Sequence, residues 1–232
     1  MIMIRVLVVD DDWFARDAIA KLVGAADGIS VVGEAANGQE ALTQARAECP
    51  DVILMDVRMP GTDGVAATRN VIAEGLATEQ GQPVRIIILT AYHVDDAVYD
   101  ALRAGASGFL LKDAAPAEIV PAIRAVAAGD AWLNPAVTRQ LIAEFNARYG
   151  QRTSAPAQIA QLTPREREVL ILLSQGLSNT DVAKQLFLSV ATVKTHLANV
   201  MKKLDVKEKA QAVIIAYQSG LVQAPPPASN AS

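Results

Sequence analysis

The chain has very little cysteine and no long apolar run. Cys49 is the only cysteine among 232 residues, so an internal disulfide is excluded. Its place beside Pro50, before an apolar strand, suggests a small buried hydrophobic residue. No apolar stretch approaches the roughly 20 residues that a membrane-spanning helix needs, and the first residues lack the layout of a signal peptide. We therefore expect a soluble, cytoplasmic protein with no membrane partner.

The chain also lacks a large excess of either charge, with 21 basic and 25 acidic residues, but the charges are unevenly distributed. Residues 1–130 hold 10 basic against 19 acidic residues, and residues 162–232 hold 8 against 5. This asymmetry indicates an acidic module followed by one that tolerates a polyanion. The positive excess is modest, so charge alone does not establish nucleic-acid binding. The length fits one large domain or two small ones.

Apolar runs alternate with helical patterns five times over residues 1–130. The expected strands are Ile4–Val9, Ile29–Val32, Val52–Met55, Val84–Leu89 and Gly108–Leu111. The expected helices follow them, beginning after residue 12, at the caps Asn37 and Asp63, and over 95–104 and 116–128. The pattern predicts an α/β fold with a doubly wound, five-stranded parallel sheet of flavodoxin-like order 2-1-3-4-5.

Polar side chains stand where these strands end. They are Asp10 and Asp11 after the first strand, Asp56 after the third, Thr90 after the fourth and Lys112 after the fifth. The carboxyl ends of parallel strands share one edge of the sheet, so we expect these five residues to gather there. Carboxylates are the hard oxygen ligands that Mg²⁺ prefers. We interpret Asp56 as a nucleophile that accepts a phosphoryl group, with Thr90 and Lys112 contacting that group. The simpler alternative is that residues 10–12 only cap the first helix, which leaves the repulsion between clustered acids uncompensated.

The C-terminal part reads as four helices. Starts are predicted at Thr163, Ser178 and Ser189, and a last helix runs from about Lys207 to Ser219. The third helix has an apolar stripe, Val193, Leu197, Val200 and Leu204. Its other face presents Thr192, Lys194, Thr195, His196, Ala198, Asn199, Lys202 and Lys203. The pattern suits a helix-turn-helix, in which Lys194 and Thr195 reach base edges while Lys202 and Lys203 neutralise phosphates. An ordinary solvated helix face is the alternative.

The predicted organisation has four parts. Residues 1–130 form the α/β domain and residues 162–222 the helical one. Between them, residues 131–161 are predicted to form a linker with an amphipathic helix over 135–149 and a flexible stretch over 150–161. Residues 223–232 form a disordered tail.

Residues 4–129 resemble a response-regulator receiver domain. The resemblance rests on Val8-Val9-Asp10-Asp11, Leu54 to Gly61, Leu89-Thr90-Ala91 and Gly108 to Asp113. It implies that Asp56 is the phosphoacceptor, that Asp11 ligates Mg²⁺ directly, and that Asp10 holds a bound water. The backbone carbonyl of Arg58 would be a further ligand, and Thr90 and Lys112 would contact the phosphoryl group. Two features depart from the family: Phe109 takes the switch position that is often Tyr, and the Gly75–Pro83 loop is long.

Residues 162–222 resemble a LuxR-type helix-turn-helix. The matching segments are Leu162 to Leu170, Gly176-Leu177-Ser178-Asn179 and Ala191 to Leu197. Together the two modules resemble a NarL/FixJ-type response regulator. This implies a transcriptional regulator whose partners are a sensor histidine kinase and double-stranded DNA. It also implies a homodimer formed through a receiver face and the C-terminal helix, where Val213, Ile214 and Tyr217 either pair or complete the domain core.

Two other functions compete with this interpretation. An aspartyl-phosphate hydrolase also uses an Asp nucleophile and magnesium, but it usually places a second Asp two residues later, where this chain has Arg58. A phosphorylation-independent DNA or RNA binder would have a vestigial acid pocket, and the complete set of five pocket residues argues against it.

Overall fold

A computed structural model of the chain describes residues 3–90, 96–112, 115–133 and 159–222. The chain separates into two compact units, residues 1–133 and 134–232. The predicted helix over 135–149 and the tail over 223–232 lie outside the described residues. No helix in the described part of the chain is long and apolar enough to cross a membrane.

The first unit contains the predicted parallel sheet in the order β2-β1-β3-β4-β5, which confirms the fold class. The strands are β1 (Ile4–Val9), β2 (Ile29–Ala35), β3 (Val52–Asp56), β4 (Arg85–Thr90) and β5 (Gly108–Leu111). The helices between and after them are α1 (Trp13–Gly24), α2 (Gly38–Glu48), α3 (Gly64–Glu74), α4 (Asp96–Ala104) and α5 (Ala115–Ala127).

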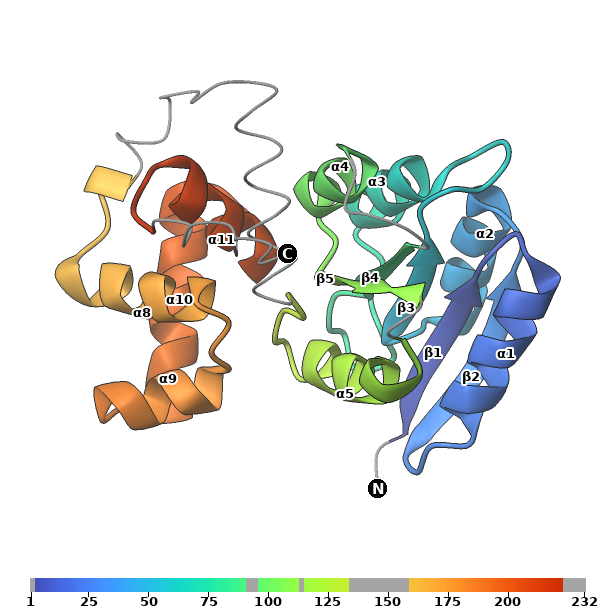
Figure 1. The fold of residues 1–232 in the computed structure, drawn as a ribbon, viewed down its shortest axis with the longest axis horizontal. Coiled ribbons are helices and arrows are strands. Elements are labelled where there is room, and N and C mark those ends of the chain that lie inside the picture. The colour runs from blue at the N-terminus through green and yellow to red at the C-terminus, as the bar shows by residue number, and fades with distance from the viewer. Residues whose placement is uncertain (1–2, 91–95, 113–114, 134–158, 223–232) are drawn as a thin grey trace, which may run out of the picture. The chain divides into compact units, whose positions relative to one another are not determined.

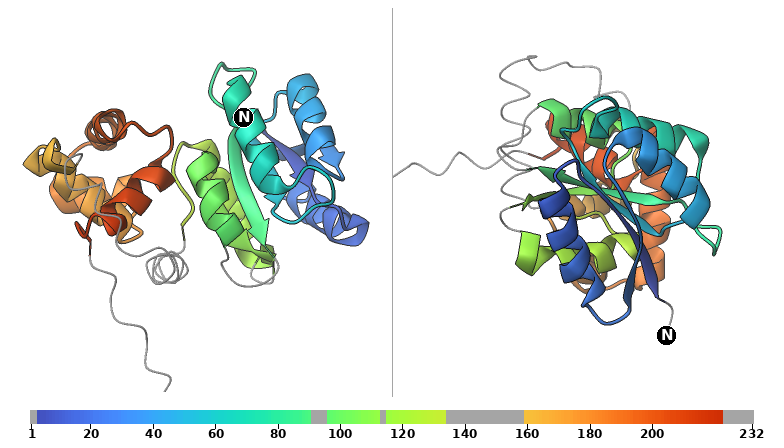
Figure 2. Two further views of the ribbon diagram at one scale, coloured as in Figure 1. Left: turned by 90° about the horizontal axis from the view of Figure 1, so that it is seen from above. Right: turned by 90° about the vertical axis from the view of Figure 1, so that its right-hand side faces the viewer.

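Helices cover both faces of this sheet (Figures 1 and 2). Helix α1 packs beside α5 on one face, and α3 packs between α2 and α4 on the other. Strand β3 is buried throughout and β4 is buried after Arg85, which is why both have continuous apolar runs rather than alternating ones. One core cluster joins Val6, Val8, Leu54 and Leu89 of the sheet to Ile119 and Ile123 of α5.

Strand β2 is three residues longer than the sequence predicts, because it continues from Val32 to Ala35. Gly33 and Glu34 look like strand breakers in the sequence. However, β2 is the edge strand next to β1, so the Glu34 side chain can be exposed, where its carboxylate lies 3.3 Å from the Arg16 guanidinium. The register with β1 shifts by one residue between Val6 and Leu7, so Gly33 and Glu34 pair with Leu7 and Val8.

The long loop before β4 is an ordered hairpin. Ala77 and Pro83 form an antiparallel bridge, and the N–H of Thr78 donates to the carbonyl of Gln82 at 2.8 Å. The Thr78 hydroxyl in turn accepts from the backbone N–H groups of Gln80 and Gln82. Hydrogen bonds within the hairpin therefore hold this long loop in place. The start of β4 stays in register with β3, where Arg85 pairs with Val52.

Cys49 is not the buried residue that the sequence suggested. It ends α2 in the left-handed conformation, with φ 44°, and is partly exposed. Its thiol lies near the carbonyl of Arg46, one turn back. Because the chain must reverse direction here to enter β3, its side chain is placed at the surface rather than in the core.

The second unit contains α8 (Pro164–Ser174), α9 (Asn179–Leu186), α10 (Val190–Leu204) and α11 (Lys209–Gln218). All three predicted starts are confirmed, since the Thr163, Ser178 and Ser189 side chains each accept a hydrogen bond from a backbone N–H in the first turn. Ile159 is also buried in this core, so this residue of the stretch predicted to be flexible over 150–161 belongs to the helical unit.

Candidate functional site

Three carboxylates converge at the carboxyl edge of the sheet. Asp10 follows β1 and Asp56 is the last residue of β3, and these neighbouring strands pair Val9 with Met55. One oxygen from each of Asp10, Asp11 and Asp56 lies within 4.8 Å of the others. Asp10 and Asp56 are buried, whereas Asp11 is exposed. The sequence prediction that strand order would bring these acids together is confirmed.

The third acid of the run has a different role. The Asp12 side chain caps α1 by accepting from the Phe14 N–H at 2.9 Å. The alternative interpretation, in which residues 10–12 cap the first helix, is therefore correct for Asp12. Asp10 is fixed instead by its neighbours: its Oδ1 accepts from the Asp12 N–H, and its carbonyl accepts from the Arg16 guanidinium at 2.6 Å. Sequence reasoning missed Arg16, although its place one turn into α1 is a usable signal.

Lys112 lies between the two buried acids. Its ammonium is 2.6 Å from Asp10 Oδ2 and 3.1 Å from Asp56 Oδ2. It follows Leu111, which pairs with Thr90 at the end of β4. Thr90 is itself nearly buried. All five polar residues predicted to share this edge therefore do so.

Burial and charge act in opposite directions on this site. Burial raises the pKa of the Asp56 carboxyl and the Asp10 charge adds to that rise, against the opposing charge of Lys112. Burial works to lower the pKa of Lys112, but its hydrogen bond to Asp10 and the two negative charges outweigh burial and hold that pKa above its ordinary value. The ammonium therefore stays protonated and partly neutralises the acids.

The backbone around Asp56 is tightly packed. A Cβ built on Gly64, the first residue of α3, would lie 2.0 Å from the carbonyl oxygen of Asp56. Only glycine fits at that distance. The Arg58 N–H is hydrogen-bonded to the Asp56 carboxylate, and the Arg58 side chain is exposed.

Phe109 lies on β5, the edge strand next to β4, and is buried. Its backbone N–H donates to the carbonyl of Trp132 at 3.2 Å. Trp132 also forms a parallel bridge with Gly108, so the segment after α5 returns to the open edge of the sheet beside the predicted switch residue.

The donor set fits a hard divalent cation. Two buried carboxylates and one exposed carboxylate offer oxygen ligands, and the exposed one leaves room for water in the coordination shell. Because the Lys112 ammonium lies 2.6 Å from Asp10 and 3.1 Å from Asp56, a bound metal would share these two carboxylates with it.

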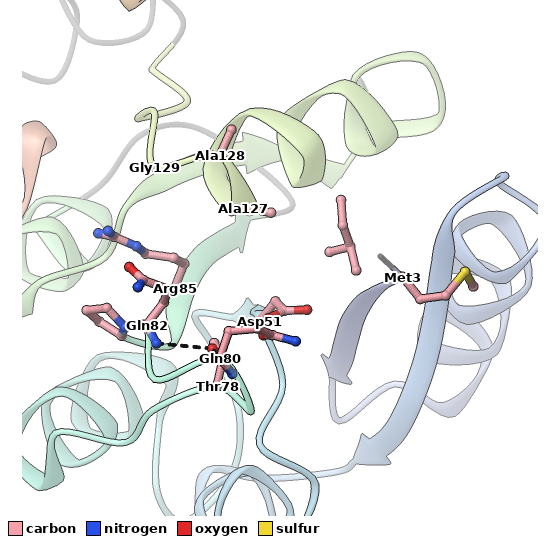
Figure 3. A pocket seen from close by; sticks show the side chains of 11 residues that line it. Met3, Asp51, Thr78, Gln80, Gln82, Arg85, Ala127, Ala128 and Gly129 are labelled. Atoms are coloured by element: carbon pink, nitrogen blue, oxygen red, sulfur yellow. Dashed lines mark hydrogen bonds between the residues drawn. The ribbon is translucent and has the colours of Figure 1, made fainter. Parts of the chain in front are cut away.

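A separate hollow lies at the opposite, amino-terminal edge of the sheet (Figure 3). Its volume is about 240 Å³, and its lining includes Ile4, Asp51, Gln82, Arg85 and Ala128. It is lined by the hairpin before β4 and by the end of α5, so it is not part of the acid cluster.

The second unit presents the predicted helix face. Val193, Leu197, Val200 and Leu204 of α10 are buried, as the apolar stripe predicts. On the other side, Lys194, Thr195, Ala198, Asn199 and Lys202 are exposed, while Thr192, His196 and Lys203 are partly buried. The turn before α10 holds Phe187 in the left-handed conformation with 94% of its surface exposed.

Lys203 has a partner within the unit. Its ammonium lies 2.6 Å from Glu166 Oε2, and the same carboxylate oxygen accepts from the Thr163 N–H as part of the capping box of α8. Lys203 therefore ties α10 to the start of α8. The sequence considered it only as a phosphate contact.

The C-terminal helix uses its largest side chain in its own core. The Tyr217 hydroxyl donates to the carbonyl of Ser174 at 2.8 Å in a buried position. Val213 and Ile214 are buried as well. The sequence left open whether these residues pair two subunits or complete the core of their own domain. Tyr217 belongs to the core of its own domain.

Comparison with known proteins gives one family match within each of the two compact units. Residues 6–124 match the model of the response regulator receiver domain, and residues 160–216 match that of the bacterial regulatory proteins of the luxR family. The acid cluster lies in the first match and α10 in the second.

Relatives cover nearly the whole chain. The transcriptional regulatory protein LiaR of Bacillus subtilis is 39% identical over 95% of this chain and all of its own length. The nitrate/nitrite response regulator protein NarL of Escherichia coli is 34% identical over 92% of this chain and 94% of its own. The crystal structure of the response regulator ChrA of a heme-sensing two-component system is 34% identical, covers 96% of this chain and all of its own, and superposes with a TM-score of 0.51. The chain therefore belongs to the two-component response regulators of the NarL type, which join a receiver domain to a LuxR-type DNA-binding domain and regulate transcription.

Proposed function

We propose that Asp56 accepts a phosphoryl group from a phosphohistidine of a sensor histidine kinase. The observation that carries the proposal is the convergence of three carboxylates on a lysine at one sheet edge. In the proposed reaction a carboxylate oxygen of Asp56 attacks phosphorus. The P–N bond to the imidazole breaks as the new P–O bond forms, and the kinase histidine leaves as neutral imidazole after taking a proton from solvent.

The pocket residues have separate roles in this proposal. Asp10, Asp11, Asp56 and the backbone carbonyl of Arg58 would hold Mg²⁺, which neutralises charge on the phosphoryl oxygens when it is bound. The Lys112 ammonium would pair with one phosphoryl oxygen, since it already lies 3.1 Å from Asp56.

Phosphorylation would act through Thr90 and Phe109. The Thr90 hydroxyl would donate to a phosphoryl oxygen, and the Phe109 ring would shift toward the space that Thr90 vacates. Phe109 is buried without a hydroxyl, so only packing distinguishes its two positions. Phosphorylation must stabilise the active conformation more than the inactive one, because only that difference shifts the population toward the active conformation.

The phosphoacceptor role is tested by incubating the chain with Mg²⁺ and acetyl phosphate. We expect a stable acyl phosphate that forms on the wild-type chain, is absent from the Asp56→Asn variant, and is abolished by EDTA. Mass spectrometry of the intact protein measures it.

The same experiment separates the competing functions. Rapid multiple-turnover release of phosphate would favour a hydrolase, and no labelling under any condition would favour a vestigial pocket. The matched control is Asp63→Asn, which removes a carboxylate at the helix cap of α3, outside the acid cluster, and should still be labelled.

We further propose that α10 enters the major groove of double-stranded DNA. The contacting residues would be Thr192, Lys194, Thr195, His196, Asn199, Lys202 and Lys203, with Lys203 contributing mainly through its support of Glu166. Support comes from the exposed polar face opposite a fully buried stripe.

The change Lys194→Ala should weaken binding to the operator and lower the slope of log K against log salt by about 1, because one phosphate or base contact is lost. Fluorescence anisotropy over a salt series measures both quantities. Lys21→Ala removes another exposed lysine, from α1, and is the control for the change in net charge. Equal curves for the two variants would contradict the assignment of α10.

The remaining assignments follow from this function. We propose that the chain acts in the cytoplasm as a homodimer on a two-fold DNA site, paired through the C-terminal helix and a receiver face. We also propose the domain boundaries 1–130 and 162–222, with 131–161 as the connecting segment.

A further inference from the structure

Asp10 is held at each of its polar atoms. Its backbone N–H donates to the carbonyl of Ala35 at 3.1 Å, and its carbonyl accepts from the Arg16 guanidinium at 2.6 Å. Of its carboxylate oxygens, Oδ1 accepts from the Asp12 N–H at 3.0 Å, and Oδ2 lies 2.6 Å from the Lys112 ammonium. Asp10 is also fully buried, so these contacts fix both its backbone and its side chain.

Two of these contacts come from β2 and α1, which pack beside β1 (Figure 1). Ala35 is the last residue of β2, so the extension of that strand beyond Val32 brings its carbonyl to Asp10. Arg16 lies one turn into α1. Side chains on a helix lean toward its N-terminus, which directs this guanidinium back to the end of β1.

The Arg16 guanidinium also pairs with Glu34 on β2. Its Nε lies 3.3 Å from Glu34 Oε2, while Nη1 makes the hydrogen bond to the Asp10 carbonyl. An arginine side chain stays charged in proteins, and an uncompensated guanidinium beside the acid cluster would oppose a bound divalent cation. Glu34 neutralises that charge, so Arg16 can donate to Asp10 with less repulsion of the metal.

We propose that Arg16 is a positioning residue of the metal site and that Glu34 supports it. The inference rests on the proposed function, in which Asp10 and Asp11 hold Mg²⁺. The Asp10 carbonyl belongs to the planar peptide group that links Asp10 to Asp11. Holding this carbonyl therefore orients the backbone from which the exposed Asp11 side chain leaves. Residues that hold metal ligands in this way commonly set the metal affinity.

The change Arg16→Met removes the charge and the hydrogen-bond donors while keeping a long side chain. We expect it to weaken Mg²⁺ binding about tenfold or more, as the loss of a group that orients metal ligands predicts. Isothermal titration calorimetry of the full-length chain with Mg²⁺ alone measures the dissociation constant. The matched control is Arg46→Met, which breaks another arginine–glutamate pair, with Glu74, from the last turn of α2. Its Mg²⁺ affinity should be unchanged.

Labelling with acetyl phosphate separates metal binding from phosphoryl transfer. In Arg16→Met, the Mg²⁺ concentration for half-maximal labelling of Asp56 should rise by the same factor as the dissociation constant. The maximal rate at saturating Mg²⁺ should be retained, because Arg16 would touch neither the metal nor the phosphoryl group. Glu34→Gln leaves the guanidinium in place without its counter-charge. It should lose less Mg²⁺ affinity than Arg16→Met, and this loss should shrink at high salt.

Arg16→Lys keeps a positive charge and a donor, so its Mg²⁺ affinity should lie between those of the wild-type chain and Arg16→Met. It replaces Arg16→Met in the test if circular dichroism shows that the methionine variant does not fold. An unchanged affinity in the folded Arg16 variants, or an equal loss in Arg46→Met, would overturn the inference and leave the labelling of the wild-type chain intact. A wild-type chain that neither binds Mg²⁺ nor is labelled would overturn both the inference and the proposed function.

Discussion

Gly64 shows how closely the backbone around Asp56 is packed. Any Cβ at this position would lie 2.0 Å from the Asp56 carbonyl oxygen and 3.0 Å from the Cα of Val57. These contacts are with backbone, which cannot rotate away as a flexible side chain could. The first turn of α3 therefore lies directly against the end of β3, and the position of Asp56, the proposed phosphoacceptor, depends on a glycine that takes no part in the proposed chemistry.

The change Gly64→Ala should destabilise the receiver domain by about 3 kcal/mol or more, because the backbone of β3 or α3 must move. Gly61→Ala is the matched control. Gly61 has φ 80° but nothing within 4 Å of a built Cβ, so it should cost only about 1 kcal/mol for the left-handed conformation. Urea unfolding followed by circular dichroism measures both. If the two variants lose equal amounts of unfolding free energy, the predicted steric cost of a Cβ at position 64 is contradicted.

At the scale of elements, one ion pair joins the proposed DNA-reading helix to the rest of its domain. Lys203 on α10 contacts Glu166, which also closes the capping box at the start of α8. Burial works to raise the pKa of Glu166, but the pairing with Lys203 and the hydrogen bonds from Thr163 outweigh it and hold that pKa below its ordinary value. The unfolded chain therefore binds this proton more tightly than the folded one.

This lowered pKa gives the helical domain an acid-dependent stability. The contribution of Glu166 is present above its unfolded pKa, near 4.5, and is lost as the pH falls toward the lower folded value. Because Lys203 is one-third exposed, we expect Lys203→Gln to cost only about 1–2 kcal/mol at pH 7, and less at pH 3. Lys202→Gln removes the same charge from the exposed neighbour and should show no such pH dependence. Thermal unfolding from pH 3 to pH 7 measures the free energy of unfolding of each variant. If the destabilisation by Lys203→Gln is independent of pH, the role of Glu166 is contradicted.

At the scale of the whole molecule, each unit has a hydrophobic core among its own described residues. One core cluster of the first unit joins the sheet to α1 and α5. That of the second unit joins α8, α10 and α11 around Leu170, Val200 and Leu204, with a second cluster between α8, α9 and α10. Each unit thus buries its own apolar surface, as independent domains do.

We therefore expect two unfolding transitions in calorimetry of the full-length chain. Mg²⁺ with beryllofluoride should stabilise one transition and a selected DNA duplex the other, each by about 3 kcal/mol when the ligand is at 100 times its dissociation constant. The Asp56→Asn variant should lose the first shift and keep the second. A single transition that responds to both ligands would show that the domains unfold as one cooperative unit.

The sequence by itself determined the elements and the places where strands end. In the first unit, continuous apolar runs bounded by turn signals indicated strands buried on both faces, and three of these runs stop at a charged residue, Asp10, Asp56 or Lys112. Local chemistry also determined the helix starts, because Thr163, Ser178 and Ser189 act on backbone groups within three residues. These are short-range effects, so a linear pattern contains them.

Tertiary structure decided what depends on neighbours far along the chain. Lys112 lies between Asp10 and Asp56 only because β5 and β1 reach the same edge from positions about a hundred residues apart. The pairing of Lys203 with Glu166 spans 37 residues, and the hydrogen bond of Tyr217 to Ser174 spans 43. A side chain on a helix face has the same periodicity whether it meets DNA, another subunit or its own core. The sequence therefore identified which face of each helix carries polar or apolar side chains. Only the folded structure showed that Lys203 contacts Glu166 and that Tyr217 contacts Ser174.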